Sequence, residues 1–476
     1  MITIAILILI VAKALPGLNT HIFSIHVTRI TSIVFLFASA LSFNCLTFES
    51  LAATQGALHN SGGIGIFSGF YQITIISQIV EIFLFIIGGG ILIAWPQFKY
   101  NNLSNFTCPP LGLREALENK KGTDYSLIVL FSSLGSSLLI SSYDLISLYL
   151  SIELQSFGLY VLSTLYKDKE SSTSAGLKYF LLGGLSSCIL LLGTGIIYSY
   201  TGTTSLESIY IINSVIDINL QYIIQGTSLG LSLIFIGFLF KIAAAPLHNW
   251  SPDVYDGTPT IVTTWLTIIP KIAILFILLE LQVKLGSFSL IGSLPLDFKT
   301  IFINNSGNFF SIFSLDAFLP LRGSTGPSGS GGAAYSYTLA TQGSGTAIFL
   351  ISSFLSLIIG SLLGLAQKKI KRLLAYSTIS HLGFILLALS INTEQSIDSF
   401  IFYIIQYTIT NLNIFLIILG LTYYFYSNNL VSVDKPTFNL VFKLKNLKLF
   451  KDNTKIDASE ATPHSRRKPS TIIFIF

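Results

Sequence analysis

Residues 237–250 read GFLFKIAAAPLHNW, and this stretch places a cation inside an otherwise apolar run. Pro246 and His248 follow Lys241 within about two helical turns. A proline inside a helix removes a hydrogen bond and clashes with the preceding turn, so a helix through this stretch is expected to break. We therefore expect Lys241 and His248 to lie on two halves of a discontinuous helix.

The rest of the chain is equally apolar. Its 476 residues are 51% hydrophobic and only 10% charged, with a mean hydropathy of +0.72, whereas a soluble domain carries about 25% charge. About 20 apolar residues cross the hydrocarbon core of a bilayer. On that criterion the sequence predicts an all-α, polytopic transmembrane bundle with eleven spans, near residues 2–15, 30–48, 73–95, 125–143, 144–165, 176–200, 228–248, 260–281, 346–367, 371–391 and 399–425.

Basic residues sort to one side of these expected spans. The loops at 49–72, 201–227 and 392–398 contain acidic residues but no Lys or Arg. Loops after odd-numbered spans carry Arg29, Lys99, Arg114, Lys120, Lys121, Lys167, Lys169, Lys368, Lys369, Lys371 and Arg372. The positive-inside rule places this second set on the cytoplasmic or matrix side. The N-terminus is then outside, and the basic tail after residue 425 is inside.

The chain divides into five expected parts. Residues 1–124 hold N-terminal spans and loops, residues 125–281 a first group of spans, and residues 346–425 a second group. Between the two groups, residues 282–345 form a Gly/Ser-rich insertion with GSTGPSGSGG at 323–332, expected to be a mobile loop. Residues 426–476 form a polar, basic tail.

Other chemistries have little support in the sequence. There is no phosphate-binding loop and no defensible Ser–His–Asp spacing. Cys45, Cys108 and Cys188 are far apart and match no metal spacing, so they are expected to be packing thiols rather than metal ligands or a disulfide framework. The basic tail is expected to lie near an anionic membrane face and not to bind nucleic acid.

Four ionisable residues fall inside expected spans: Glu153, Lys178, Lys241 and Lys271. A charge at mid-bilayer costs a few kcal/mol even on the mild insertion scale, so these side chains should face the bundle interior, pair with each other or touch water. They could be structural ion pairs, and Lys178 lies near the start of its span and could extend to the interface. A carboxylate with several buried lysines is also the raw material of a proton relay.

Two histidines and a second proline add to this set. Lys271 directly follows Pro270, and a proline inside a span frees a backbone carbonyl. Such irregular backbone persists at membrane depth only where protein or water satisfies it. His248 and His381 lie in or next to spans, and histidine suits proton transfer near neutral pH. Each histidine on its own could equally be an interfacial polar residue.

Four segments carry a family resemblance. DLISLYLSIELQSFGLYVL, GLKYFLLGGLSSCILLLGTGIIY, FKIAAAPLHNWSPDVYDGTPTIVTTWLTIIPKIA and GSLLGLAQKKIKRLLAYSTISHLGF resemble, in order, the subunit 2 family of mitochondrial NADH:ubiquinone oxidoreductase (respiratory complex I). The resemblance implies an antiporter-like, proton-pumping module with two inverted five-helix repeats, each with a broken helix. It also implies the mitochondrial inner membrane, an N-terminus on the intermembrane-space side, and membrane-arm subunits and lipids as partners.

The resemblance assigns roles by motif. The subunit itself would bind no cofactor, and redox chemistry would occur in other subunits, so the chain would be a non-redox part of a translocase that couples NADH:ubiquinone electron transfer to proton pumping. The implied proton relay consists of the essential glutamate Glu153, the additional lysine Lys178, Lys241 of the first broken helix with its companion His248, the central-axis lysine Lys271, and the axis residue His381. Whether Glu153 pairs with Lys178, with Lys241, or with each in turn stays open.

One departure from the family pattern concerns the C-terminal part. The family continues after a span such as 399–425 with a second broken helix and another lysine, whereas this chain becomes polar and basic from residue 427. The second repeat is therefore expected to be incomplete, as a truncated or intron-read-through product or with helices supplied by another polypeptide. Two other hypotheses remain: a stand-alone cation/proton antiporter, and a structural subunit that no longer pumps.

Overall fold

The computed structural model describes residues 1–14, 24–54, 64–93, 111–166, 169–215, 221–285 and 344–431. Helices make up most of this part, with one short β-hairpin, β1 (Ile64–Ile66) and β2 (Tyr71–Ile73). The helices are α1 (Ile2–Ala14), α3 (Ser24–Thr54), α4 (Ile75–Ile93), α5 (Leu111–Ile140), α6 (Leu145–Thr164), α7 (Glu170–Thr201), α8 (Leu206–Val215), α9 (Gln221–Ile242), α10 (Trp250–Gly257), α11 (Thr260–Leu285), α14 (Ser344–Leu365), α15 (Ile370–Ile391) and α16 (Glu394–Val431).

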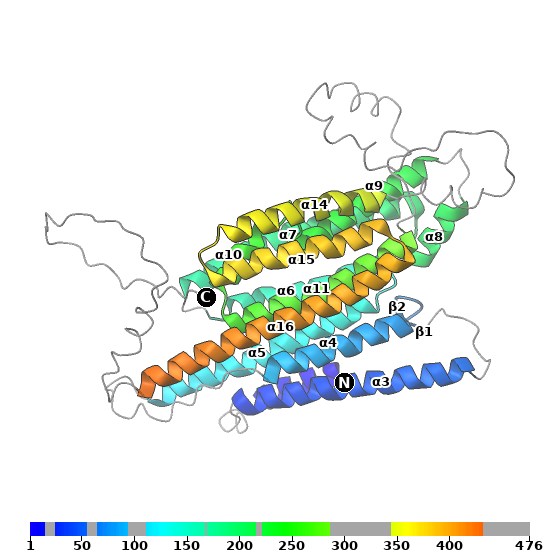
Figure 1. Ribbon diagram of the computed structural model, residues 1–476. Coiled ribbons are helices and arrows are strands. Elements are labelled where there is room, and N and C mark those ends of the chain that lie inside the picture. The colour runs from blue at the N-terminus through cyan, green and yellow to red at the C-terminus, as the bar shows by residue number, and fades with distance from the viewer. Residues whose placement is uncertain are drawn as a thin grey trace, which may run out of the picture.

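The polytopic helical bundle expected from the sequence is confirmed. Within the described ranges, nine helices are long and apolar enough to cross a membrane, and two shorter apolar segments, α1 and residues 125–140 of α5, accompany them. Each of the eleven expected spans thus coincides with one of these segments. The long helices run alongside one another in one bundle (Figure 1).

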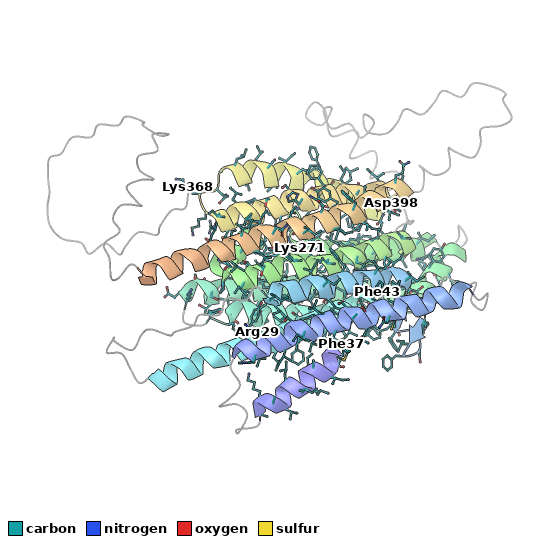
Figure 2. The ribbon with its side chains drawn as sticks, turned by 60° about the horizontal axis from the view of Figure 1, so that its bottom comes forward. Arg29, Phe37, Phe43, Lys271, Lys368 and Asp398 are labelled. Carbon is teal, nitrogen blue, oxygen red and sulfur yellow. The ribbon has the colours of Figure 1, made fainter. Side chains whose placement is uncertain are left out.

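The two ends of the bundle differ in charge, as the loop pattern predicts. Figure 2 shows Arg29 and Lys368 toward one end, Asp398 toward the other, and Lys271 between them. Residues expected on the same side of the membrane therefore lie at the same end of the helices.

Short elements in two of the expected loops order the acidic end. β1 and β2 pair antiparallel, with Gly65 opposite Gln72. Asp144 caps α6 by accepting a hydrogen bond from the backbone N–H of Ile146 at 2.8 Å, and its second oxygen accepts one from the Thr204 hydroxyl at 2.7 Å. An N-cap carboxylate of this kind satisfies a backbone donor that the helix leaves free. The start of α6 is thereby tied to the segment before α8.

Two helix pairs share the same close packing. A Cβ atom added at Gly135 of α5 would lie 2.5 Å from the backbone nitrogen of Gln155 in α6. A Cβ added at Gly360 of α14 would lie 2.7 Å from the backbone nitrogen of Ser380 in α15. Small residues let membrane helices approach this closely. The α5–α6 and α14–α15 pairs therefore match, one in each group of spans.

The expected break near Pro246 is present but begins earlier than the span 228–248 predicts. The α9 helix ends at Ile242, four residues before Pro246. In a continued helix the proline ring would clash with the carbonyl of Ile242. Ala243 follows with φ 64°, and the N–H groups of Ala244 and Ala243 bond the carbonyls of Leu239 and Phe240 at 3.0 and 3.1 Å. This is a Schellman motif, which satisfies carbonyls at a helix end.

Pro270, in contrast, does not end its helix. The α11 helix continues from Thr260 to Leu285 and packs against α16, α5, α4 and α9. The Tyr407 hydroxyl of α16 donates to the Thr267 carbonyl, 3.3 Å away and close to the proline. Neighbouring helices can satisfy carbonyls that a proline frees. Lys271 therefore lies near the middle of α11, which is the most buried span of the described bundle.

Several expectations fall on residues outside the described ranges. The Gly/Ser-rich insertion, apart from its first residues in α11 and its last in α14, belongs to this group, as do Cys108 and the tail from residue 432 onward. Cys45 and Cys188 are both exposed free thiols.

Candidate functional site

Glu153 and Lys241 meet in the interior of the first group of spans. The Nζ atom of Lys241 lies 3.1 Å from Oε1 of Glu153, and the two side chains are only 7% and 15% exposed. The Ser187 hydroxyl of α7 donates to the same carboxylate oxygen. A buried ion pair is stable only when further hydrogen bonds support it, and Ser187 supplies one. In this structure Glu153 therefore pairs with Lys241 and not with Lys178.

A small cavity adjoins this ion pair. It has a volume of about 20 Å³, and its lining includes Lys241, Tyr160, Ser186 and Trp250. A cavity of this size has room for about one water molecule. Trp250 also donates its indole N–H to the carbonyl of Phe240 at 2.9 Å, so the start of α10 is bonded to the end of α9. The broken helix thus places a water-sized space next to the lysine.

Lys178 differs from its expected place among the buried charges. The α7 helix begins at Glu170, which leaves Lys178 near its start. Its side chain is 55% exposed, and its ammonium lies 2.7 Å from Oδ2 of Asp253 in α10. The structure therefore brings Glu153 together with Lys241 and places Lys178 in a separate ion pair at the basic end.

His248 lies in the connection between α9 and α10, and it is buried. Its Nδ1 atom has no hydrogen-bond partner among the described residues. The ring of Tyr376 in α15 lies edge-on to it, with 6.3 Å between ring centroids. The break in the helix therefore leaves a titratable ring between the first group of spans and α15.

Lys271 is the most isolated charge of the described bundle. Its residue is 2% exposed, and its Nζ atom has no hydrogen-bond partner among the described residues. The rings of Tyr255 and Tyr407 lie on α10 and α16, with centroids 5.8 and 5.9 Å from that nitrogen. Aromatic faces at this distance attract a cation. Among the described residues, Lys271 thus faces aromatic rings and no carboxylate.

His381 belongs to the same cluster as Lys271. Its ring lies 6.1 Å from the ring of Tyr407, which also faces Lys271. Its Nδ1 atom is 2.9 Å from the hydroxyl of Tyr403. Lys271 and His381, which lie on different helices, are therefore joined through Tyr407 of α16, and Tyr403 of the same helix contacts His381 alone.

The sequence predictions missed these tyrosines and Ser187. Tyr255, Tyr403 and Tyr407 look like ordinary membrane aromatics, and no spacing links them to a lysine on another helix. The only available signal was that Tyr255 follows the broken helix within a few residues.

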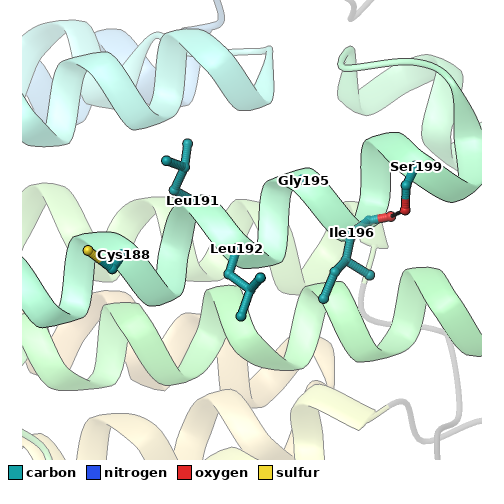
Figure 3. Close-up of a pocket in the computed structure, with 6 residues that line it drawn as sticks. All are labelled: Cys188, Leu191, Leu192, Gly195, Ile196 and Ser199. Atoms are coloured by element: carbon teal, nitrogen blue, oxygen red, sulfur yellow. Dashed lines mark hydrogen bonds between the residues drawn. The ribbon is translucent and has the colours of Figure 1, made fainter.

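A groove on the outer side of α7 is not part of this site. Its lining consists of Cys188, Leu191, Leu192, Gly195, Ile196 and Ser199 (Figure 3). The one polar interaction drawn there is the bond from the Ser199 hydroxyl to the carbonyl of Ile196, which lies within the helix itself. Among the described residues no group of three His, Cys, Asp or Glu side chains could hold a metal ion. The groove therefore contributes no titratable group to the site formed by Glu153, Lys241, Lys271 and the two histidines.

Comparison with known proteins gives a family match. The model of the family described as "NADH:quinone oxidoreductase/Mrp antiporter, TM" matches residues 142–301 and 333–450. The unmatched stretch, 302–332, lies within the Gly/Ser-rich insertion. The match also runs to residue 450, beyond residue 425, near which the family resemblance is expected to end.

Individual relatives agree with this match. The chain is 42% identical over 450 residues to NADH-ubiquinone oxidoreductase chain 2 of Rhizopus oryzae, covering 94% of this chain and 72% of that one. It is 34% identical over 364 residues to the protein of the same name from Marchantia polymorpha, covering 73% of this chain and 63% of that one, so it spans less than two thirds of that relative. A chain of respiratory complex I from Thermus thermophilus with bound aureothin has a similar fold, with a TM-score of 0.56 and 23% identity over 88% of this chain and 70% of that one.

Proposed function

Because this chain belongs to the NADH:quinone oxidoreductase/Mrp antiporter family of membrane proteins, we propose that it translocates protons as a membrane-arm subunit of respiratory complex I. It works in the mitochondrial inner membrane with its N-terminus on the intermembrane-space side. Its partners are other membrane-arm subunits and lipids. It carries no redox cofactor of its own, and the electron transfer that drives it occurs in other subunits.

The observation that carries this proposal is the buried pair of Glu153 and Lys241. An ion pair keeps the proton on its lysine, whereas a lysine alone in an apolar site releases its proton more readily. Opening and closing the pair would therefore unload and reload Lys241. The cavity beside Lys241 has room for one water molecule, which would carry the proton at that point.

Lys271 is the next residue that takes up and releases the proton in the proposed route. It is buried, it has no carboxylate partner in the described part of the chain, and it touches tyrosines of α10 and α16. His248 lies between the two lysines in chain order and suits proton transfer at neutral pH. From Lys271 the contacts lead through Tyr407 to His381. Lys178 is exposed and forms an ion pair with Asp253 of α10 at the basic end, so its role in the route is to hold α10 in place.

Proton pumping per NADH oxidised tests this function. The variants are Lys241→Met and the double variant Glu153→Gln/Lys241→Met, which removes both charges and leaves no unpaired ion in the interior. Lys368→Met is the matched control because Lys368 is an exposed lysine. The proposal expects both test variants to lose pumping by the assembled complex while the control keeps it. Normal pumping by the assembled double variant would contradict the proposal.

A stand-alone cation/proton antiporter is the second candidate, because the matching family also includes Mrp antiporters. Relatives over nearly the whole chain are NADH-ubiquinone oxidoreductase subunits, which favours the first proposal. Membrane fractionation separates the two candidates. A complex I subunit co-migrates with NADH-oxidising activity on native gels, whereas a separate carrier runs free of it. A structural subunit that no longer pumps would co-migrate and yet tolerate the Glu153→Gln/Lys241→Met variant.

A further inference from the structure

The short helix α10 contributes side chains to the surroundings of both buried lysines. Trp250, at its first position, lines the cavity beside Lys241. Tyr255, one and a half turns later, faces the ammonium of Lys271. A shift of α10 along its axis or about it would therefore change the surroundings of both lysines at once. The contacts that fix α10 therefore affect both lysines of the proposed proton route.

Two carboxylates of α10 are held by cations from other helices. Asp256 is the less exposed of the two, at 19%, and its Oδ2 atom lies 2.7 Å from Nζ of Lys369 and 3.1 Å from Nε of Arg372. Asp253 lies between Lys178 of α7 and the NH2 nitrogen of Arg372, at 2.7 and 3.2 Å. Arg372 thus bridges both carboxylates of α10.

The cations converge on the C-terminal end of α10. Lys371 donates to the carbonyl of Thr258, the C-cap residue, at 2.7 Å. Together with Lys369 and Arg372, it comes from the start of α15, in the second group of spans. Positive charge near a helix C-terminus interacts favourably with the free carbonyls and the helix dipole. Figure 1 shows α10 beside α7 and α15, the two helices that supply these cations.

We propose that Asp256 and Arg372 are positioning residues for proton translocation: their ion pair fixes α10 against α15 and so sets Trp250 and Tyr255 against the two buried lysines. This proposal rests on the proposed function. The pair joins the first group of spans to the second, so a rearrangement in either group reaches the other through α10. A network of three ion-paired cations and two carboxylates is better placed for this than one exposed pair, because isolated surface pairs contribute little.

The test uses the assembled complex in inner-membrane vesicles. The variants are Asp256→Asn, Arg372→Gln and the conservative Asp256→Glu, and the control is Lys368→Gln. Lys368 lies next to Lys369 and loses the same single charge, but it makes no ion pair with the described residues of α10. Three quantities are measured: assembled complex on native gels, NADH oxidation with a soluble electron acceptor, and protons pumped per NADH.

If Asp256 and Arg372 are positioning residues, their substitution should lower the number of protons pumped per NADH. Asp256→Asn and Arg372→Gln should lower protons per NADH about two- to fivefold in the complex that assembles, and Asp256→Glu should restore most of the pumping. A merely structural role would reduce the amount of assembled complex but leave its pumping ratio unchanged, and that result overturns the proposal. If Asp256→Asn fails to assemble, Arg372→Gln, whose side chain is more exposed, decides by the same ratio.

The outcome is distinguishable from a failure of the proposed function. If Glu153→Gln/Lys241→Met leaves pumping intact, the proposed function fails and the positioning proposal falls with it. If that variant abolishes pumping while Asp256→Asn and Arg372→Gln pump as well as Lys368→Gln, the positioning proposal alone is wrong.

Discussion

The ammonium of Lys241 lies 3.1 Å from the carboxylate of Glu153, although the two residues are 88 positions apart in the sequence. Their helices, α9 and α6, each pack along α7, and the Ser187 hydroxyl of α7 completes the pair. The pair therefore ties three helices together at a buried point. Removing one charge alone leaves the other without its partner in an apolar interior, which is costly.

A double-mutant cycle at this pair tests its energetic role. Glu153→Gln and Lys241→Met should each lower the thermal stability of the complex, by as much as about 3 kcal/mol for an uncompensated buried charge. The double variant should be more stable than the sum of the single effects predicts, because no unpaired charge remains. Thermal inactivation of the solubilised complex gives the comparison, and strictly additive losses would show that the two groups do not interact.

Trp250 provides a prediction about the broken helix. Trp250→Phe removes the indole hydrogen bond to the Phe240 carbonyl, which keeps the Ala243 N–H as its remaining donor, so the expected cost in stability is about 0.5–1.5 kcal/mol. The expected result is reduced pumping, because Trp250 also lines the cavity at Lys241. The matched control is Trp265→Phe, which removes the hydrogen bond that the indole N–H of Trp265 donates to the Ser132 hydroxyl. Equal pumping by both variants at equal assembly would contradict this prediction.

Ala243 and Ala244 form a second matched pair. Both are fully buried, but only Ala243 has a left-handed φ, of 64°. Alanine already carries the cost of that conformation, roughly 1–2 kcal/mol for an L-residue, and a β-branched residue tolerates positive φ still less well. Ala243→Val should therefore lower the thermal midpoint of the complex more than Ala244→Val. The reverse order would mean that crowding rather than backbone conformation dominates at this turn.

Much of the fold could be predicted because its signals are local. Long apolar runs identify the spans, and Pro246 identifies the broken helix, although α9 ends four residues earlier because the proline ring excludes the preceding turn. Pro270 shows the limit of the same rule. Its helix continues, and the hydroxyl of Tyr407, on a helix distant in the sequence, donates to the Thr267 carbonyl near the proline.

The partners of the buried charges could not be predicted, because they depend on contacts between distant segments. The sequence indicates that Glu153 needs a cation, but both Lys178 and Lys241 fit that need. The fold decides, because Lys178 lies near the start of α7, within reach of Asp253. The bridge from Asp256 to Arg372 joins residues 116 positions apart, and no periodicity reveals it.

The most direct measurement of proton translocation by this chain compares two substitutions of Lys271. Lys271→Met removes the charge, whereas Lys271→Arg keeps a charge that does not dissociate in proteins. If Lys271 takes up and releases a proton, both variants should lose proton pumping per NADH while the complex stays assembled. If Lys271→Arg pumps normally, a fixed positive charge between Tyr255 and Tyr407 is sufficient, and the proposed relay through Lys271 is contradicted.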